Sequence, residues 1–148
     1  DRERQPVLDE VAIVAHGLVF DALVLPRHLP RLARVLERHP QLVVVVDHGA
    51  KPGIRAGEID RWRADMATIA AHPRAHCKLS GLVTEASPGA GLDVLAPYID
   101  TLLHLFGPKR LLWGSDRIVV GDHRDLYAAS AQLASGIWVA DPVYVWKF

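Results

Sequence analysis

Short apolar runs separated by helix-like segments recur along this chain, and each run ends in polar residues. The three clearest runs are LVVVVDHGAKP at 42–52, HCKLSGL at 76–82 and RLLWGSD at 110–116. The segments between them are long enough for the crossovers that parallel strands require. Parallel strands carry their C-terminal ends to one mouth of an α/β barrel, where active sites lie. The pattern therefore predicts an α/β fold with reactive groups gathered at one edge of a parallel sheet.

Helix-like and strand-like segments alternate along the whole chain. The pattern predicts helices at 7–18, 29–36, 59–71, 92–106 and 122–135, strands at 19–25, 42–46, 75–82 and 110–113, and a loop at 84–91. A closed (β/α)₈ barrel has eight such strands and about 250 residues. We therefore predict half of a barrel, with four parallel strands and helices along the outer face.

The composition is that of one globular domain over residues 1–148. Lys plus Arg and Asp plus Glu both total 17, and the zero net charge argues against nucleic acid or an anionic membrane as a partner. No apolar run approaches the roughly 20 residues of a membrane-spanning helix, and no signal peptide is visible. The single cysteine, Cys77, fits a reducing compartment and predicts a cytoplasmic location. The first residue is Asp1 and not Met, which suggests a segment of something longer.

Two candidate catalytic side chains stand at predicted strand ends. Asp116 follows the fourth strand, where a carboxylate can bind a metal or exchange a proton with hydrolytic water. The alternative for Asp116 is a structural cap of the loop or the next helix. His48 ends the second strand, where an imidazole can bind a metal or polarise a carbonyl group. The alternative for His48 is a hydrogen bond within its loop, and the adjacent Asp47 is expected to point to the opposite face.

Three further residues are candidates for substrate binding. Lys78 and Ser80 have the same parity on the third strand, so they share one face of the sheet. Lys78 can meet an anionic group of a substrate, or it can pair with a carboxylate such as Asp116 or Glu85. Lys51 can bind a substrate carboxylate, although loop lysines are usually only solvated.

Several well-known catalytic motifs do not occur. The sequence has no His-x-His, His-Glu-x-x-His or Cys-x-x-Cys, so local spacing gives no complete metal site. It has no Gly-x-Ser-x-Gly, which argues against a serine hydrolase, and no phosphate-binding loop. Cys77 alternates away from Lys78 and is expected to be a packed thiol.

Five segments together carry a resemblance to a known family. They are VFDALVL at 19–25, DHGAKP at 47–52, the helix with Trp62, KLSGLVTEA at 78–86 and FGPKRLLWGSD at 106–116. In this order they resemble the amidohydrolase-superfamily lactonases, the family of L-fuconolactonase and 2-pyrone-4,6-dicarboxylate lactonase. The resemblance implies a TIM barrel that hydrolyses a sugar or dicarboxylate lactone. It also implies that the four strands are strands 5–8 of the barrel, its C-terminal half.

The resemblance also implies roles for two residues. His48 matches a family histidine that polarises the lactone carbonyl or holds a metal. Asp116 matches the family's proton shuttle, which activates water and then protonates the leaving alkoxide. Some members work without a tightly held metal, so one divalent ion such as zinc, with His48 and Asp116 as ligands, is an option and not a requirement. The implied partner is a small-molecule lactone.

The chain is expected to be incomplete as an enzyme. The His-x-His of the family's first strand would precede Asp1, Arg117 and Ile118 replace the Trp-Pro expected after Gly-Ser-Asp, and the tail 136–148 departs from the family pattern. We therefore expect a hydrolase parent, an inactive isolated chain, and self-association through exposed strand edges. Two alternatives remain. One is a related metal-dependent decarboxylase or amidohydrolase, and the other is a non-catalytic half-barrel interaction module or gene remnant.

Overall fold

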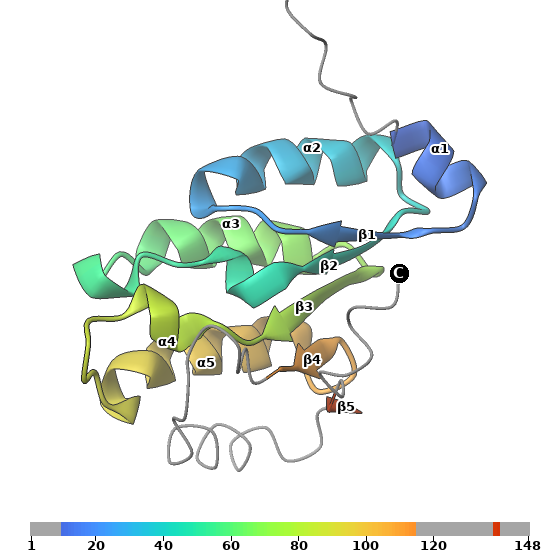
Figure 1. Ribbon diagram of the computed structural model, residues 1–148. Helices are drawn as coiled ribbons and strands as arrows, with labels where there is room; N and C mark the ends of the chain where they lie inside the picture. Colours follow the sequence, from blue (N-terminus) through green and yellow to red (C-terminus); the bar gives the residue numbers. More distant parts are fainter. Residues whose placement is uncertain (1–9, 115–137, 140–148) are drawn as a thin grey trace, which may run out of the picture.

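The computed structural model describes residues 10–114 and 138–139 (Figure 1). The helices are α1 (Glu10–Ala15), α2 (Leu29–Arg38), α3 (Asp60–Ala70), α4 (Leu82–Glu85) and α5 (Leu92–Phe106). The strands are β1 (Val19–Ala22), β2 (Val43–Val46), β3 (Ala75–Leu79), β4 (Leu111–Trp113) and β5 (Trp138–Val139). The short 3₁₀ helices are η1 (Pro26–His28), η2 (Asp47–Ala50) and η3 (Ile54–Ala56). None of the helices described is both long and apolar enough to cross a membrane.

The described strands form one parallel sheet in the order β1-β2-β3-β4-β5. Val45 pairs with His76 and Lys78 pairs with Leu112 in this sheet. Figure 1 shows α2, α3 and α5 together on one side of the sheet. The four predicted strands are all present and parallel, so the predicted fold class, part of a (β/α) barrel, is confirmed. The two-residue strand β5, which the sequence pattern does not predict, pairs with β4.

The end of the predicted third strand is a turn followed by a short helix. The pattern predicts a strand at 75–82, but β3 ends at Leu79. Gly81 has a φ of 64°, a left-handed value that glycine adopts without strain, and α4 begins directly after it. The extended chain therefore stops two residues before Gly81. The predicted helix at 122–135 lies outside the described residues.

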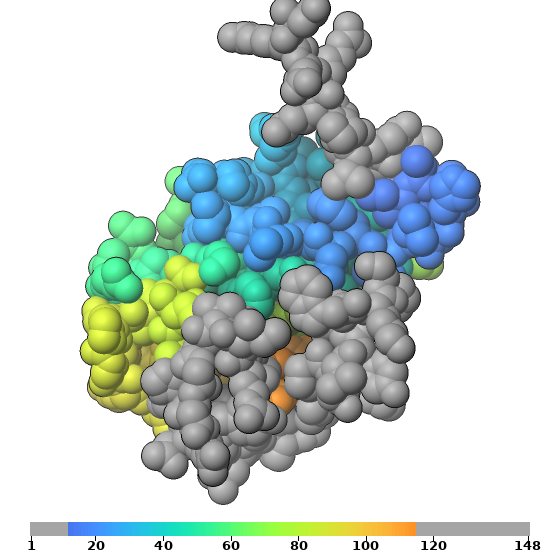
Figure 2. Space-filling model, viewed as in Figure 1, coloured from blue at the N-terminus to red at the C-terminus, as the bar shows by residue number. Residues whose placement is uncertain are grey.

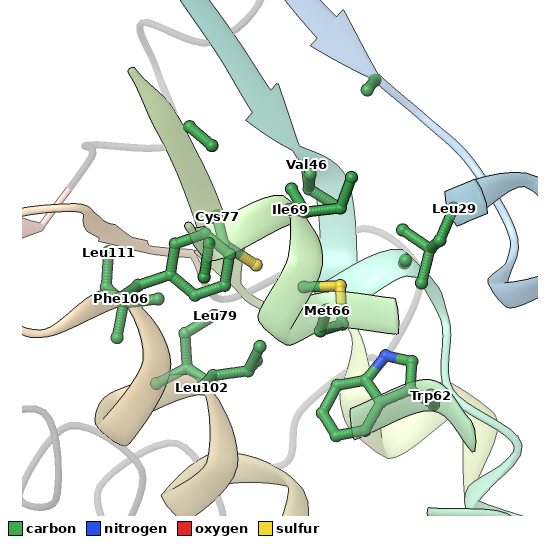
Figure 3. Close-up of a cluster of buried hydrophobic side chains, with 14 of the residues drawn as sticks. Leu29, Val46, Trp62, Met66, Ile69, Cys77, Leu79, Leu102, Phe106 and Leu111 are labelled. Carbon is green, nitrogen blue, oxygen red and sulfur yellow. The ribbon is translucent and has the colours of Figure 1, made fainter. Parts of the chain in front are cut away.

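The main hydrophobic core lies between the sheet and its helices. Figure 3 shows the side chains that fill it, among them Val46, Trp62, Met66, Ile69, Cys77, Leu79, Leu102, Phe106 and Leu111. Burial of each large apolar side chain contributes about 1.5–3 kcal/mol, so this layer fixes the helices on the sheet. Burial also raises the pKa of the Cys77 thiol to about 12, in agreement with the packed thiol that the sequence predicts.

Strand β2 is fully buried on one face only. Its continuous apolar run predicts burial on both faces. Val44 and Val46 are completely buried, whereas Val43 and Val45 are only partly buried. The reason is that α2, α3 and α5 lie on one side of the sheet (Figure 1). The opposite face, which is the face of Val43 and Val45, can therefore carry polar groups.

Arg110, which directly precedes β4, joins the C-terminal ends of two helices. Its guanidinium donates to the carbonyl oxygens of Ala70 at 2.7 Å, His72 at 3.2 Å and Leu105 at 3.1 Å. The same group lies 5.5 Å from the centre of the Phe106 ring. The last carbonyl groups of a helix lack partners within the helix, so one planar cation here satisfies the ends of both α3 and α5.

Replacing Arg110 with Lys is expected to lower the free energy of unfolding by about 1–3 kcal/mol, because an ammonium cannot satisfy carbonyl groups on both helices. Urea unfolding followed by circular dichroism measures the change. Lys109→Gln, at the exposed neighbouring position, is the control and should have little effect. Equal stability of Arg110→Lys and Lys109→Gln would show that the network contributes nothing.

Candidate functional site

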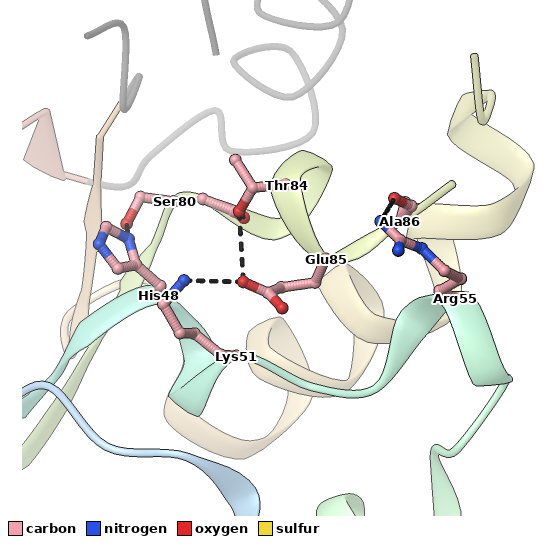
Figure 4. Close-up of polar contacts among 8 residues, drawn as sticks. His48, Lys51, Arg55, Ser80, Thr84, Glu85 and Ala86 are labelled. Carbon is pink, nitrogen blue, oxygen red and sulfur yellow. Dashed lines mark hydrogen bonds and ion pairs between the residues drawn. The ribbon is translucent and has the colours of Figure 1, made fainter. Parts of the chain in front are cut away.

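The segment after β2 forms an unusual turn at the C-terminal edge of the sheet. His48, Gly49, Ala50 and Lys51 all have left-handed backbone angles, with φ values of 51°, 57°, 60° and 52°. Each non-glycine residue in such a region costs about 1–3 kcal/mol, so the surrounding structure must hold the turn in place. The turn brings His48 and Lys51 beside the segment that follows β3 (Figure 4).

A hydrogen bond joins His48 to Ser80. The Nδ1 atom of His48 lies 2.8 Å from the Oγ atom of Ser80, which is itself buried. If the hydroxyl donates, the ring proton is on Nε2, which can then donate to a carbonyl oxygen. If Nδ1 carries the proton, the lone pair of Nε2 can bind a metal instead. The sequence pattern places both residues at strand ends but does not predict this contact.

A second polar contact joins the same two loops. The ammonium of Lys51 lies 2.7 Å from a carboxylate oxygen of Glu85, and the Thr84 hydroxyl lies 3.3 Å from the same oxygen (Figure 4). Lys51 and Glu85 are both partly exposed, so this ion pair alone contributes no more than about 1 kcal/mol. Its main effect is geometric, because it ties the turn after β2 to helix α4.

Lys78 pairs with two aspartates that the sequence does not suggest as its partners. Its ammonium lies 2.6 Å from a carboxylate oxygen of Asp47 and 3.0 Å from both oxygens of Asp21. Of the two partners that the sequence suggests, Glu85 binds Lys51 instead, and Asp116 lies outside the described residues, so its pairing with Lys78 stays a prediction. Strand register explains the result, because Val46 and Cys77 are paired and the next residues, Asp47 and Lys78, are therefore adjacent.

The two aspartates determine the charge state of Lys78. Burial acts to lower the pKa of the Lys78 ammonium, but hydrogen bonds and attraction from Asp47 and Asp21 outweigh it, so the pKa is raised. Asp21 and Asp47 are site residues that sequence reasoning missed. Side chains alternate along each strand, and the positions of Asp21 and Asp47 direct them to the same face of the sheet as Lys78. This alternation is the sequence signal that could have identified them.

The fifth predicted site residue, Asp116, lies outside the described residues, so its position relative to His48 stays a prediction. Within 10–114 and 138–139, no group of three or more His, Cys, Asp or Glu side chains could hold a metal ion. The predicted pair of ligands therefore has one member, His48, in this part of the chain. On their own, the described residues do not fit a metal.

The model of the amidohydrolase family matches residues 8–141. The chain belongs to the amidohydrolase family. This amidohydrolase is 50% identical over 112 residues to an L-fucono-1,5-lactonase from Burkholderia ambifaria. That match covers 76% of this chain and 38% of the relative, so the amidohydrolase chain spans well under half of the relative's length.

Solved structures agree with the family and the fold. An amidohydrolase from Burkholderia multivorans with bound zinc is 33% identical, with a TM-score of 0.73 over 87% of this chain and 52% of that chain. A candidate 2-pyrone-4,6-dicarboxylic acid hydrolase from Pseudomonas putida is 25% identical, with a TM-score of 0.70 over 87% of this chain and 51% of that chain. The partial barrel therefore matches about half of each solved chain.

Replacing Lys78 with Met is expected to lower the free energy of unfolding by about 1–3 kcal/mol at neutral pH, because the largely buried Asp47 loses its ion pair. Because the pKa of Lys78 is higher in the folded state, its ion pairs contribute fully to the free energy of unfolding at any pH below the pKa that Lys78 has in the unfolded chain. This contribution is lost as pH rises through the pKa of Lys78 in the folded state. Urea unfolding should thus give a constant difference from wild type up to about pH 10 and a shrinking one above it.

The control for this measurement is Lys109→Met, which removes an exposed ammonium and should leave no such pH dependence. A Lys78→Met difference that grew with alkaline pH would contradict the assigned ion pairs.

Proposed function

We propose that this chain forms the C-terminal half of the barrel of a lactone hydrolase, which opens a sugar lactone by attack of activated water. The observation that carries the proposal is the position of His48 beside Ser80 at the edge where parallel strands end. The similarity to an L-fucono-1,5-lactonase supports a lactone as the substrate. Because the chain spans only part of its relatives, the activity proposed is that of a whole barrel.

His48 would polarise the carbonyl group of the lactone. With the Ser80 hydroxyl donating to Nδ1, the Nε2–H group of His48 donates to the carbonyl oxygen and stabilises the negative charge that develops there. The left-handed turn fixes the direction of this donor before the substrate arrives. Such preorganisation is what makes a hydrogen bond effective in a transition state.

Asp116 would move the proton. Its carboxylate takes a proton from water as the water oxygen forms a bond to the carbonyl carbon. The ring C–O bond then breaks, and Asp116 returns the proton to the alkoxide, which gives a hydroxy acid. If one divalent ion such as zinc takes part, His48 and Asp116 are the proposed ligands, and the ion would supply a Lewis acid for the carbonyl oxygen.

The charges around the site favour a sugar lactone over a dicarboxylate. Lys51 already faces Glu85, and Lys78 already faces Asp21 and Asp47. A dianionic substrate would have to compete with these carboxylates for each cation. A neutral sugar lactone would not, since its hydroxyl groups can accept from the ammonium donors of Lys51 that Glu85 does not use, and can donate to the carboxylates around Lys78. Lys51, Lys78 and Ser80 therefore remain proposed substrate-lining residues.

The activity can be tested by joining this chain to the preceding half of the Burkholderia ambifaria lactonase. The chimera is expected to hydrolyse L-fucono-1,5-lactone, whereas the 148-residue chain alone is expected to show no turnover. His48→Gln and Asp116→Asn should each lower kcat by about 100-fold or more, because each removes a group that acts on the reacting atoms. A pH-stat assay measures the acid released.

Lys109→Gln in the same chimera is the control and should keep full activity. Full activity of the Asp116→Asn chimera would contradict the assigned proton transfer, and turnover by the isolated chain would contradict its dependence on the other half.

A second candidate function is that of an interaction module. Among the described residues β1 pairs with β2 alone, and Leu18, Val19 and Leu23 in and beside it are 57%, 56% and 66% exposed. Figure 2 shows this blue segment at the molecular surface. An apolar strand edge of this kind favours pairing with another chain.

The isolated chain is therefore expected to self-associate, and Val19→Lys with Leu23→Lys is expected to shift it toward monomer, because charges at a strand edge oppose pairing. Sedimentation velocity over a range of concentrations measures the association. The double substitution Arg61→Ala and Arg63→Ala, which changes the exposed surface of α3 and leaves β1 unaltered, should leave the association unchanged. A wild-type chain that stays monomeric and unfolds cooperatively would exclude the module.

A further inference from the structure

The strained turn after β2 needs a support that the ion pair and hydrogen bond around it do not supply. His48 and Lys51 make their contacts through side chains, to Ser80 and Glu85. Neither contact holds the backbone at Gly49, the second of four consecutive left-handed residues. The angles at His48, Ala50 and Lys51 are costly, so a backbone without support would relax and carry the His48 ring away from Ser80.

Trp62 in α3 supplies this support from inside the core. Its indole Nε1–H donates to the backbone carbonyl of Gly49 at 2.7 Å, and the residue is 2% exposed. A Cβ atom at Gly49 would lie 3.1 Å from a methyl carbon of Leu102 and 3.4 Å from one of Leu82. The backbone of Gly49 is therefore seated in the core, with its carbonyl directed at one buried donor.

The indole is itself held in place. The rings of Trp62 and Tyr98 have centroids 5.4 Å apart at an angle of 49°, a tilted contact of the kind that aromatic pairs favour. Tyr98 is also buried. Helices α3 and α5 thus hold the indole donor, and the donor holds the carbonyl of Gly49. Gly49 lies between His48, which contacts Ser80, and Lys51, which contacts Glu85.

We propose that Trp62 is a positioning residue for the site, which holds His48 in its orientation through the carbonyl group of Gly49. Its effect on catalysis rests on the proposed lactonase function, whereas its effect on the turn does not. The indole touches neither substrate nor reacting atoms. It acts through the backbone, and its loss changes the direction of the His48 ring and not the chemistry of that ring.

The substitution Trp62→Phe tests the proposal, because it keeps an aromatic ring and removes the N–H donor. The amide of Lys51 donates to the His48 carbonyl at 2.9 Å within the turn, so its hydrogen exchange reports on the turn directly. In the 148-residue chain, Trp62→Phe is expected to speed exchange at Lys51 by about tenfold or more, with little change at Val44 and Val46. NMR measures these rates in the absence of any substrate.

Met66→Leu is the matched control, since Met66 is a fully buried residue of the same helix and Leu conserves its volume. An unchanged Lys51 rate in Trp62→Phe would overturn the proposal. Equal acceleration of hydrogen exchange at Lys51 and in β2 would also overturn it, as would the same acceleration in Met66→Leu. Either result would indicate only a general loosening of the core.

A second variant covers the case in which Trp62→Phe does not fold. Tyr98→Leu keeps the indole donor but removes the ring that holds it, and it is expected to speed Lys51 exchange by about threefold or more. No change at Lys51 in Tyr98→Leu would then overturn the proposal.

The effect of Trp62 on activity is measured in the chimera that joins this chain to the preceding half of the Burkholderia ambifaria lactonase. There Trp62→Phe is expected to lower kcat by about tenfold with KM within about twofold, because a misdirected His48 donor affects the transition state more than substrate binding. Equal loss in Met66→Leu would overturn the catalytic part of the proposal. An inactive wild-type chimera would refute the lactonase function, and the exchange rates would still decide the role of Trp62.

Discussion

Packing of α2, α3 and α5 against one face of a parallel sheet is the constraint on which the rest of this structure depends. Side chains alternate along each strand, so burial of Val46 and Cys77 beneath the helices directs Asp47 and Lys78, the residues that follow them, to the other face. A charged cluster there avoids the large desolvation cost it would have in the helix-covered core. One-sided packing thus separates an apolar layer that stabilises the fold from a polar face that carries the site.

The strained turn after β2 transfers the rigidity of that apolar layer to the site. Backbone strain persists only where surrounding structure fixes it, and here a buried indole, two leucine side chains and contacts with the loop after β3 do so. The side chains of His48 and Lys51 therefore project from a loop whose backbone packs against the core and whose side chains contact the loop after β3. A site on rigid supports keeps its geometry when substrate binds, which suits the oxyanion stabilisation proposed for His48.

Much of the fold and part of the site can be predicted from the sequence. Apolar runs and Gly-Pro breaks are local signals, so the order of elements, the parallel sheet and the placement of His48, Lys78 and Ser80 at strand ends follow from them. The end of β3 could not be placed, because Ser80 and Leu82 fit a strand pattern and only the left-handed backbone of Gly81 between them ends the strand. Strand β5 was missed, since two residues give no periodicity.

The sequence by itself determined the family, the alternation of strands with helices, and which reactive side chains are available. Only the tertiary structure decided their partners: Ser80 for His48, and Asp21 and Asp47 for Lys78. These contacts join residues on different strands and loops, and they depend on strand register and on left-handed backbone angles. Ala50 and Lys51 do not favour such angles, so the shape of the turn depends on the core that packs against it.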